Sequence, residues 1–427
     1  MKLKTLSAAM ILATVPMTGA FAAALDRSGQ SIAGFLQPGN YFEAGLSVLD
    51  PKVTGKVSDS WVPAGAAAPL APAYQGTGLS DMADDYYFPS ATLKLQLTEK
   101  FSFGLIYDQP FGAAATYSTG DFSHPAAGGV FHNGTESTQV EVDTQNLTML
   151  FGFQPTENFN IYGGPVYQTA KGNVQLRGLA YGSDLALGAY NADMKEDSAV
   201  GWLAGLAYQI PEIALKASLT YRSEIDHDLS TNEYGQSNIL AMAAQNPVYD
   251  VVSSTKITTP QSVNLDFQTG VMANTVAFAN VRWVNWKEFT IRPEQFGAVS
   301  ETLGSAGAAP NNPNGFDIVG YTDDQISATV GVGRKFNEQW AGNVSVGWDS
   351  GAGNPVSTLG PTEGYWNVGL GLQFSPAANY FIAGGVKYFM LGDAKAQVAS
   401  DFGSDSYVAE FEDNDAWGYG LKMGYRF

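Results

Sequence analysis

The feature that most constrains this chain is a strict alternation of side chains with a period of two. Between residues 416 and 427 every second residue is apolar, and the residues between them are glycine, lysine or arginine. The apolar positions are Trp417, Tyr419, Leu421, Met423, Tyr425 and Phe427. Because successive side chains of a β-strand point to opposite faces, this pattern predicts a strand with one continuous apolar face.

The same alternation recurs along most of the chain. Comparable segments begin near residues 41, 91, 101, 147, 159, 202, 215, 263, 277, 326, 340, 366, 380 and 416. Each is roughly 10 residues long, which is the length that a tilted strand needs to cross a bilayer. The aromatic residues gather at the segment ends, as in the girdles of a transmembrane barrel, whereas a soluble sandwich favours shorter strands. We therefore predict an all-β fold, a transmembrane antiparallel β-barrel of about 14 strands.

The connections between these segments alternate in length. Tight turns are followed by long loops, which we expect near 50–86, 110–139, 170–198, 222–259, 285–323, 350–363 and 391–415. Short turns on the periplasmic side and long extracellular loops are typical of outer-membrane barrels, so both ends of the barrel should lie on the short-turn side. An even strand number lets the last strand pair with the first and leaves no open edge in lipid. The terminal Phe427 is the kind of residue that we expect the barrel assembly machinery to recognise.

The first residues indicate export. Lys2 and Lys4 precede an apolar run and a stretch of small residues, which together predict a signal peptide over 1–24. The apolar run is too short for a membrane anchor. Cleavage falls after Ala22 or Ala24, and the sequence does not decide between them. The expected organisation is a signal peptide (1–24), a short N-terminal segment (25–40) that forms a reduced plug, and the barrel (41–427), placed in the outer membrane of a Gram-negative bacterium.

The composition limits the possible partners. The formal net charge of -19 gives the chain little reason to bind nucleic acid, and the absence of cysteine rules out disulfides and thiol chemistry. His124, His132 and His227 fall in predicted loops without metal-ligand spacing, so we expect no cofactor and no metal. The last long loop carries the acidic residues Asp401, Asp405, Glu410, Glu412, Asp413 and Asp415. They could share divalent cations with lipopolysaccharide, but a solvated charge run fits better because no ordered calcium-loop spacing is present.

Three stretches resemble the FadL-type family of outer-membrane transporters for long-chain fatty acids and other hydrophobic compounds. They are Gly201–Gly205 with Leu219–Glu224, Thr259–Val263 with Val284–Phe289, and Tyr107–Gly112 with Tyr117. The resemblance implies a fourteen-stranded monomeric barrel that takes up a hydrophobic, fatty acid-like molecule. It also implies a plug with an N-P-A motif. Gln37-Pro38-Gly39 stands at that place here, and the segment before the first strand is short.

Pro110 is the most informative residue of the third predicted strand. Proline cannot donate to a β-ladder, so it marks a bulge, an edge or a kink, and Gly112 follows shortly after. The resemblance implies a lateral opening here, bordered by Asp108, Pro110, Phe111 and Gly112, through which an apolar ligand enters the membrane. The alternative is that Pro110 only ends the strand.

Other candidate ligand contacts lie in the lumen and in the loops. Parity turns Lys94, Arg222 and Arg282 inward, where a cation could hold a fatty-acid carboxylate or pair with neighbours such as Glu224 or Asp266. Leu240 and Met242 belong to an apolar run of the 222–259 loop, where a ligand groove or a packed lid is expected. The leading hypothesis is passive uptake of a hydrophobic molecule with lateral release. The alternatives are a general diffusion porin for small polar solutes and, with less support, an outer-membrane hydrolase.

Overall fold

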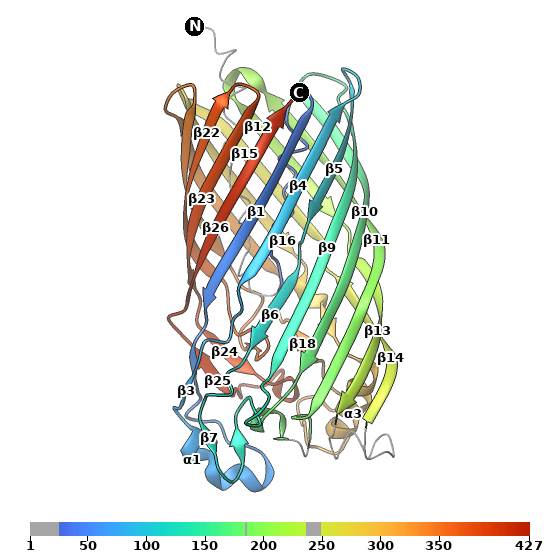
Figure 1. Cartoon of the computed structure of the whole chain (residues 1–427). Coiled ribbons are helices and arrows are strands. Elements are labelled where there is room, and N and C mark those ends of the chain that lie inside the picture. The colour runs from blue at the N-terminus through green and yellow to red at the C-terminus, as the bar shows by residue number, and fades with distance from the viewer. Residues whose placement is uncertain (1–24, 184–185, 236–248) are drawn as a thin grey trace.

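The computed structural model, which describes residues 25–183, 186–235 and 249–427, is a closed antiparallel β-barrel of fourteen strands (Figure 1). Seventeen strands form its sheet, because three of the barrel strands are each interrupted once, between β5 and β6, β12 and β13, and β14 and β15. The strand number predicted from the sequence is thereby confirmed.

The wall strands follow each other around the ring in chain order, with each interrupted pair occupying one position. Their bounds are β1 (Tyr41–Lys52), β4 (Tyr86–Gln96), β5 (Phe101–Asp108), β6 (Gly112–Thr116), β9 (Gln139–Phe153), β10 (Phe159–Gln175), β11 (Tyr190–Ile210), β12 (Leu215–Arg222), β13 (Ile225–Gly235), β14 (Tyr249–Thr259), β15 (Ser262–Met272), β16 (Thr275–Val284), β19 (Gln325–Lys335), β20 (Trp340–Asp349), β22 (Tyr365–Ala377), β23 (Tyr380–Leu391) and β26 (Asp415–Arg426).

The loops carry short elements of their own. Five of their strands make a second small sheet in the order β21-β24-β25-β2-β3. The bounds are β2 (Gly55–Val57), η2 (Gly65–Leu70), α1 (Ala71–Tyr74), β3 (Gly78–Leu79), β7 (Ser123–His124), β8 (Gly128–Gly129), η3 (Leu179–Tyr181), η5 (Pro211–Ile213), η6 (Trp286–Glu288), β17 (Thr290–Ile291), α3 (Glu294–Ser305), β18 (Val319–Gly320), β21 (Val356–Ser357), β24 (Ala394–Gln397), η7 (Ala399–Asp401) and β25 (Ala409–Phe411). No helix in the described part of the chain is both long and apolar enough to span a bilayer.

The barrel closes through β1 and β26, which pair along their whole length from Tyr41 opposite Arg426 to Lys52 opposite Asp415. The alternation in the last strand works as predicted, since Trp417, Leu421 and Tyr425 are exposed on the outer face while Ala416, Gly418 and Gly424 are buried inside. Figure 1 shows the C-terminus at the end of the barrel that carries the short turns, with α1 and α3 at the opposite, long-loop end.

The wall is taller on one side than the sequence predicted. The expected loops 170–198 and 222–259 are in large part strand, because β10 continues to Gln175, β11 begins at Tyr190, and β13 and β14 extend β12 and β15. The polarity of these extensions is reversed. In β13 the apolar Ile225 and Leu229 point inward while Asp226 and Asp228 are exposed. This is the pattern of a wall surrounded by water, so a search for outward apolar rows does not find it.

The lipid-facing row of β26 gives a direct test of the barrel orientation. Leu421, which is 57% exposed, lies at the centre of the strand, whereas Leu97, which is 61% exposed, lies in a short turn. We expect Leu421→Arg to destabilise the folded barrel by about 2–4 kcal/mol and Leu97→Arg by about 0–1 kcal/mol, because the cost of a charge falls from the bilayer centre toward the interface. Urea unfolding in lipid vesicles measures both values, and equal costs would contradict this placement.

Candidate functional site

The N-terminal segment 25–40 lies inside the barrel and is bound by inward-pointing cations of the wall. Arg282 forms an ion pair with Asp26 at 2.6 Å, with both side chains almost completely buried. Arg222 donates to the main-chain oxygen of Gln30 at 2.5 Å, and Lys94 donates to that of Gln37 at 2.7 Å. All three predicted cations therefore point into the lumen and have partners in this segment. Sequence reasoning predicted neither these partners nor the contacts.

Further polar contacts follow the same segment. Lys216 donates to the main-chain oxygen of Leu36 at 2.9 Å, and Asn264 donates to that of Gly29 at 2.7 Å. The carboxylate of Asp108 accepts a hydrogen bond from the Ser28 hydroxyl at 2.7 Å. Main-chain groups away from water need hydrogen-bond partners. Here the side chains of the wall provide the hydrogen bonds that a neighbouring strand would otherwise provide.

Phe35 is the apolar anchor of the N-terminal segment. Its ring is fully buried and lies edge-on to Tyr162, with 5.8 Å between ring centroids. Two inward glycines make room for it. A methyl group at Gly104 of β5 would lie 2.4 Å from Cδ2 of Phe35, and one at Gly152 of β9 would lie 2.9 Å from Cζ. The ring of Phe35 therefore packs directly against the main chain of the adjacent strands β5 and β9.

The third barrel strand is interrupted at Pro110. Asp108 at the end of β5 pairs with Asn146, and Gly112 at the start of β6 pairs with Asp143. Three residues of this strand therefore face only two residues of β9, which is the geometry of a bulge. The main-chain groups of strand three that have no partner in the wall are hydrogen-bonded by the N-terminal segment inside the barrel. The nitrogen of Arg27 donates to the oxygen of Pro110 at 2.6 Å, and the nitrogen of Gly112 donates to the oxygen of Leu25 at 2.8 Å.

The same interruption opens the ladder on the other side, toward β4. Main-chain pairing between β4 and β5 stops at Ala91 opposite Tyr107 and resumes at an isolated bridge between Ala83 and Ala115, while the Tyr86 hydroxyl contacts the main chain of Ala114 between them. Between these points, 86–90 of β4 pairs with β1 alone. Pro89 lies in this stretch, where the absence of a donor is tolerated because that edge is unpaired. Sequence reasoning missed Pro89, although a proline inside an alternating segment was an available signal.

Arg27 occupies the inner side of this gap. Its guanidinium carbon lies 4.0 Å from the centroid of the Tyr86 ring and 5.8 Å from that of Phe88, both on β4. A methyl group at Gly112 would lie only 2.2 Å from Nη1 of Arg27. Gly112 has no side chain and therefore leaves the room that Arg27 needs where it crosses strand three. The predicted residues Asp108, Pro110, Phe111 and Gly112 are brought together here with a partner from the N-terminal segment.

Cavities lie on the two sides of this region. A cavity of about 500 Å³ occupies the short-turn half of the lumen and has a mixed lining, with polar residues such as Thr92, Asn343 and Lys422 beside apolar ones such as Ile32, Phe278 and Leu370. Toward the long loops lie two smaller apolar cavities of about 70 and 20 Å³. The larger of them is bordered by Leu25, Tyr86, Val140 and Leu359, and the smaller by Phe111, Met194, Ile257 and Phe289.

The long loops close the barrel above these cavities. Trp286 is fully buried and packs edge-on against Phe111, with ring centroids 5.4 Å apart. Thr358, from the connection between β20 and β22, accepts a hydrogen bond from Tyr117 at 2.7 Å and contacts the hydroxyl of Tyr181 at 2.8 Å. Loops from distant parts of the sequence thus meet in one aromatic cluster.

Glu363, in the same connection, is placed in a poorly hydrated position. Burial raises the pKa of its carboxyl from an ordinary value of 4.5 to about 7. Because the folded state favours the protonated form, the contribution of this group to stability is present at low pH. It is lost as the pH rises from about 4.5 to about 7.

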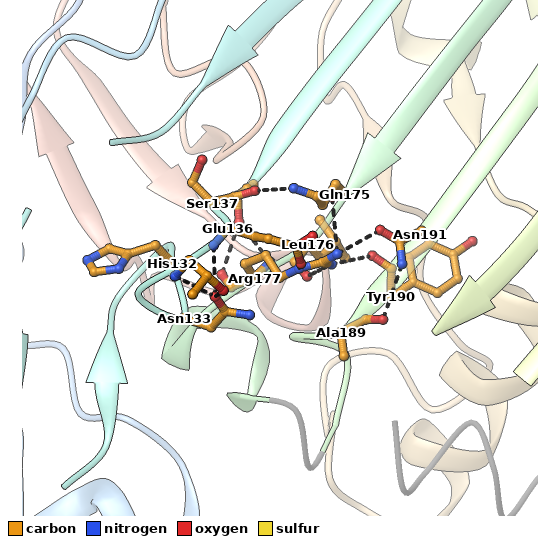
Figure 2. Close-up of polar contacts among 12 residues, drawn as sticks. His132, Asn133, Glu136, Ser137, Gln175, Leu176, Arg177, Ala189, Tyr190 and Asn191 are labelled. Carbon is orange, nitrogen blue, oxygen red and sulfur yellow. Dashed lines mark hydrogen bonds and ion pairs between the residues drawn. The ribbon is translucent and has the colours of Figure 1, made fainter. Parts of the chain in front are cut away.

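Another buried arginine, Arg177, fixes the loop ends of β9, β10 and β11. Arg177 donates to Glu136, to the side chains of Gln175 and Asn191, and to the main-chain oxygens of Leu176 and Tyr190, as Figure 2 shows. All five donors of this guanidinium are used. The Arg177 site is therefore structural, because its guanidinium has no donor left for a ligand.

The helix of the 285–323 loop is held by a buried carboxylate. Glu233 of β13 is completely buried and accepts hydrogen bonds from the main-chain nitrogens of Gln295 and Phe296, each at 2.8 Å. These are the free donors of the first turn of α3, where a negative charge also interacts favourably with the helix dipole. Tyr190 and Ser253 donate to the same carboxylate.

The remaining predicted residues take no part in this arrangement. Leu240 and Met242 lie outside the described residues. His227 lies in strand β13 and not in a loop, because of the wall extension, and contacts Asp197 and Gln168. In the acidic loop Glu410 pairs with Lys56 at 3.0 Å. Across the described ranges, no group of three or more acidic or histidine side chains could hold a metal ion.

The seat of Phe35 can be tested with one methyl group. We expect Gly104→Ala to displace the N-terminal segment at a cost of about 1–3 kcal/mol, because the ring cannot keep its place. The matched control is Gly384→Ala, since the nearest atom there is the oxygen of Gly420 at 3.7 Å. Liposome swelling should show faster entry of small sugars for Gly104→Ala only. Equal rates for both variants would mean that the segment does not block the lumen.

The contact between Glu233 and the first turn of α3 can be tested with a similar pair of variants. Glu233→Gln keeps the shape of the side chain but replaces one acceptor oxygen by a donor, which leaves a buried main-chain donor unpaired at a cost of about 1–3 kcal/mol. Hydrogen exchange over 294–305 should accelerate while the wall strands stay protected. Glu301→Gln, on the exposed face of the same helix, serves as control. Unchanged exchange in Glu233→Gln would show that α3 is held by other contacts.

Comparisons with known proteins give the family. A crystal structure of a Pseudomonas aeruginosa FadL homologue is similar with a TM-score of 0.66 and 15% identity, covering 92% of each chain. The Pseudomonas putida toluene transporter TodX gives a TM-score of 0.60 at 12% identity over 95% of this chain and 96% of its own. The CymD monoaromatic hydrocarbon channel gives 0.55 at 10% identity over 98% of both. At these identities the structures show the fold. No curated protein sequence matches.

The family model described as outer membrane protein transport protein (OMPP1/FadL/TodX) matches residues 31–427. This confirms the resemblance read from the sequence, and a family of transport channels agrees with the expectation that the chain is not an enzyme. The chain belongs to the OMPP1/FadL/TodX family of outer-membrane transport proteins for hydrophobic compounds.

Proposed function

We propose that this protein takes up a hydrophobic, fatty acid-like molecule and releases it sideways into the membrane through the gap between β4 and strand three. The observation that carries the proposal is the interrupted ladder, in which 86–90 of β4 has a strand partner on one side only. The stretch 195–202 of β11 also lacks a ladder partner on one side, toward β13, but the gap at β4 is the one that the N-terminal segment and two cavities border, so we place lateral passage here.

The cavities support a hydrophobic ligand. The cavities beside Phe111 and Leu25 are apolar, and the larger cavity below them contains apolar residues such as Ile32, Phe278 and Leu370 among its polar ones. A hydrophobic molecule that passes the aromatic loop cluster therefore finds apolar surface on both sides of the gap. In this proposal the N-terminal segment 25–40 acts as a plug that sends the ligand sideways.

The alternative of a general diffusion porin receives less support. The plug is tied to the wall by Arg282, Arg222, Lys94 and the buried Phe35, so a continuous water path is not expected in this state. TodX and CymD are named for toluene and monoaromatic hydrocarbons, and neutral aromatics of that kind are also candidate ligands here. We further propose a monomer, exported by the signal peptide 1–24, inserted by the barrel assembly machinery and surrounded by outer-membrane lipids and lipopolysaccharide.

Deleting one residue tests the lateral route. Removal of Pro110 leaves two residues opposite the two of β9 and brings β5 and β6 into one register, so that the strand can run straight. We expect uptake of a labelled fatty acid and of toluene into vesicles to fall to background, while the barrel still folds. Fold is checked by the shift in gel mobility on heating.

The control for this experiment is deletion of Gly120, which lies in an exposed loop turn. That variant should transport normally. If the Pro110 deletion folds and transports as well as the parent protein, the ligand leaves by another path.

A further inference from the structure

Arg27 is a buried arginine of the N-terminal segment, and one nitrogen of its guanidinium has no hydrogen-bond partner among the described residues. The side chain is only 9% exposed, and it lines both the cavity of about 500 Å³ in the lumen and the larger of the two apolar cavities beside the gap. Its nearest carboxylate oxygen is on Asp143, and at 4.0 Å from Nη1 this contact is too long for a hydrogen bond. Its Nη2 has no hydrogen-bond partner among the described residues.

The comparison with Arg282 shows what a satisfied guanidinium looks like in this lumen. Arg282 donates to Asp26, Ser262, Asn264 and the side chain of Gln30. Arg222 also has one unpartnered nitrogen, Nη1, but it borders none of the three cavities. Tyr86 interacts with the Arg27 guanidinium as well, so the open position is at Nη2. A buried guanidinium nitrogen without a partner is costly, and of Arg282, Arg222 and Arg27 it is Arg27 that borders the cavities at the gap.

We propose that Arg27 is the head-group site of the transported molecule and binds the carboxylate of an amphipathic acid at the lateral gap. The proposal rests on the proposed function and names its ligand class, an acid with an apolar tail, in place of a neutral hydrocarbon. A planar guanidinium matches a carboxylate in a two-pronged contact, and the rings of Tyr86 and Phe88 keep that plane in position. Leu25, Val140 and Leu359 of the adjacent cavity would contact the tail.

This position couples recognition to the plug. Arg27 is part of the backbone that completes strand three at Pro110, so a ligand bound to its side chain acts on the segment that covers the gap. The predicted cations Lys94, Arg222 and Arg282 then have a different task, which is to hold the plug. The head-group site is thereby assigned to the plug itself and not to the wall.

The test compares three probes of equal chain length, oleate, methyl oleate and oleyl phosphate, on the full protein in an uncharged detergent. The variants are Arg27→Gln, Arg27→Lys and the control Lys171→Gln. Lys171 contacts the same Asp143 at 3.4 Å, but its side chain is half exposed on the outer face. Comparing each variant with the parent cancels the partitioning of the probes into micelles.

The parent protein should bind oleate about 10- to 100-fold more tightly than methyl oleate, as expected for charge-assisted hydrogen bonds. Arg27→Gln should abolish this preference by weakening oleate alone, Arg27→Lys should retain part of it, and Lys171→Gln should retain it fully. Unchanged binding of methyl oleate shows that the variants still fold. Since Arg27→Lys keeps the charge in the plug, it provides the comparison if the glutamine variant does not fold.

A preference that persists in Arg27→Gln, or that is absent from the parent, would overturn the proposal while leaving hydrophobic uptake intact. A preference for oleyl phosphate over oleate that depends on Arg27 would assign the site to a lipid phosphate and would also overturn the carboxylate assignment. If neither oleate nor methyl oleate binds the parent, the proposed function fails together with this inference.

Discussion

The structure depends on the requirement that every main-chain donor and acceptor in the lipid-covered wall has a partner inside the protein. Closure of β1 onto β26 meets this requirement around the ring. Strand three is an exception, because Pro110 cannot donate and main-chain pairing with β4 is interrupted beside it. There the main chain of Leu25 and Arg27 completes the hydrogen bonding from the inside. The plug therefore supplies hydrogen bonds that the wall lacks at the gap.

The charges of the lumen follow from the same requirement. A segment that crosses a barrel without a neighbouring strand exposes main-chain carbonyls, and cationic side chains satisfy them at Gln30, Leu36 and Gln37. The ion pair between Asp26 and Arg282 adds an attraction that breaks only at high cost when buried. Cations that appear in the sequence as ligand contacts are therefore used to position the plug, which leaves Arg27 as the arginine with an unpartnered nitrogen beside the gap.

Much of the barrel could be predicted from the sequence because lipid imposes a local, period-two pattern. The row from Trp417 to Tyr425 and the break at Pro110 are visible in short stretches of chain. The extension formed by β13 and β14 was missed because its outer face is in water, so Asp226 and Asp228 point outward and the pattern is inverted. Asp26, Arg27 and Phe35 were missed for a different reason. Their partners, such as Arg282, are distant in sequence, and no local pattern encodes those contacts.

Photoaffinity labelling is the most direct measurement of the central claim that the ligand leaves through a wall gap covered by the plug. A long-chain fatty acid with a photoreactive group in its tail would be bound to the protein in a membrane, irradiated, and located by mass spectrometry. The account predicts labels on 86–90 of β4, on 110–114 and on 25–28, with little on the opposite wall around Val330 of β19. Labels spread evenly around the barrel, or concentrated in the lumen near Asn343 and Ser345, would contradict it.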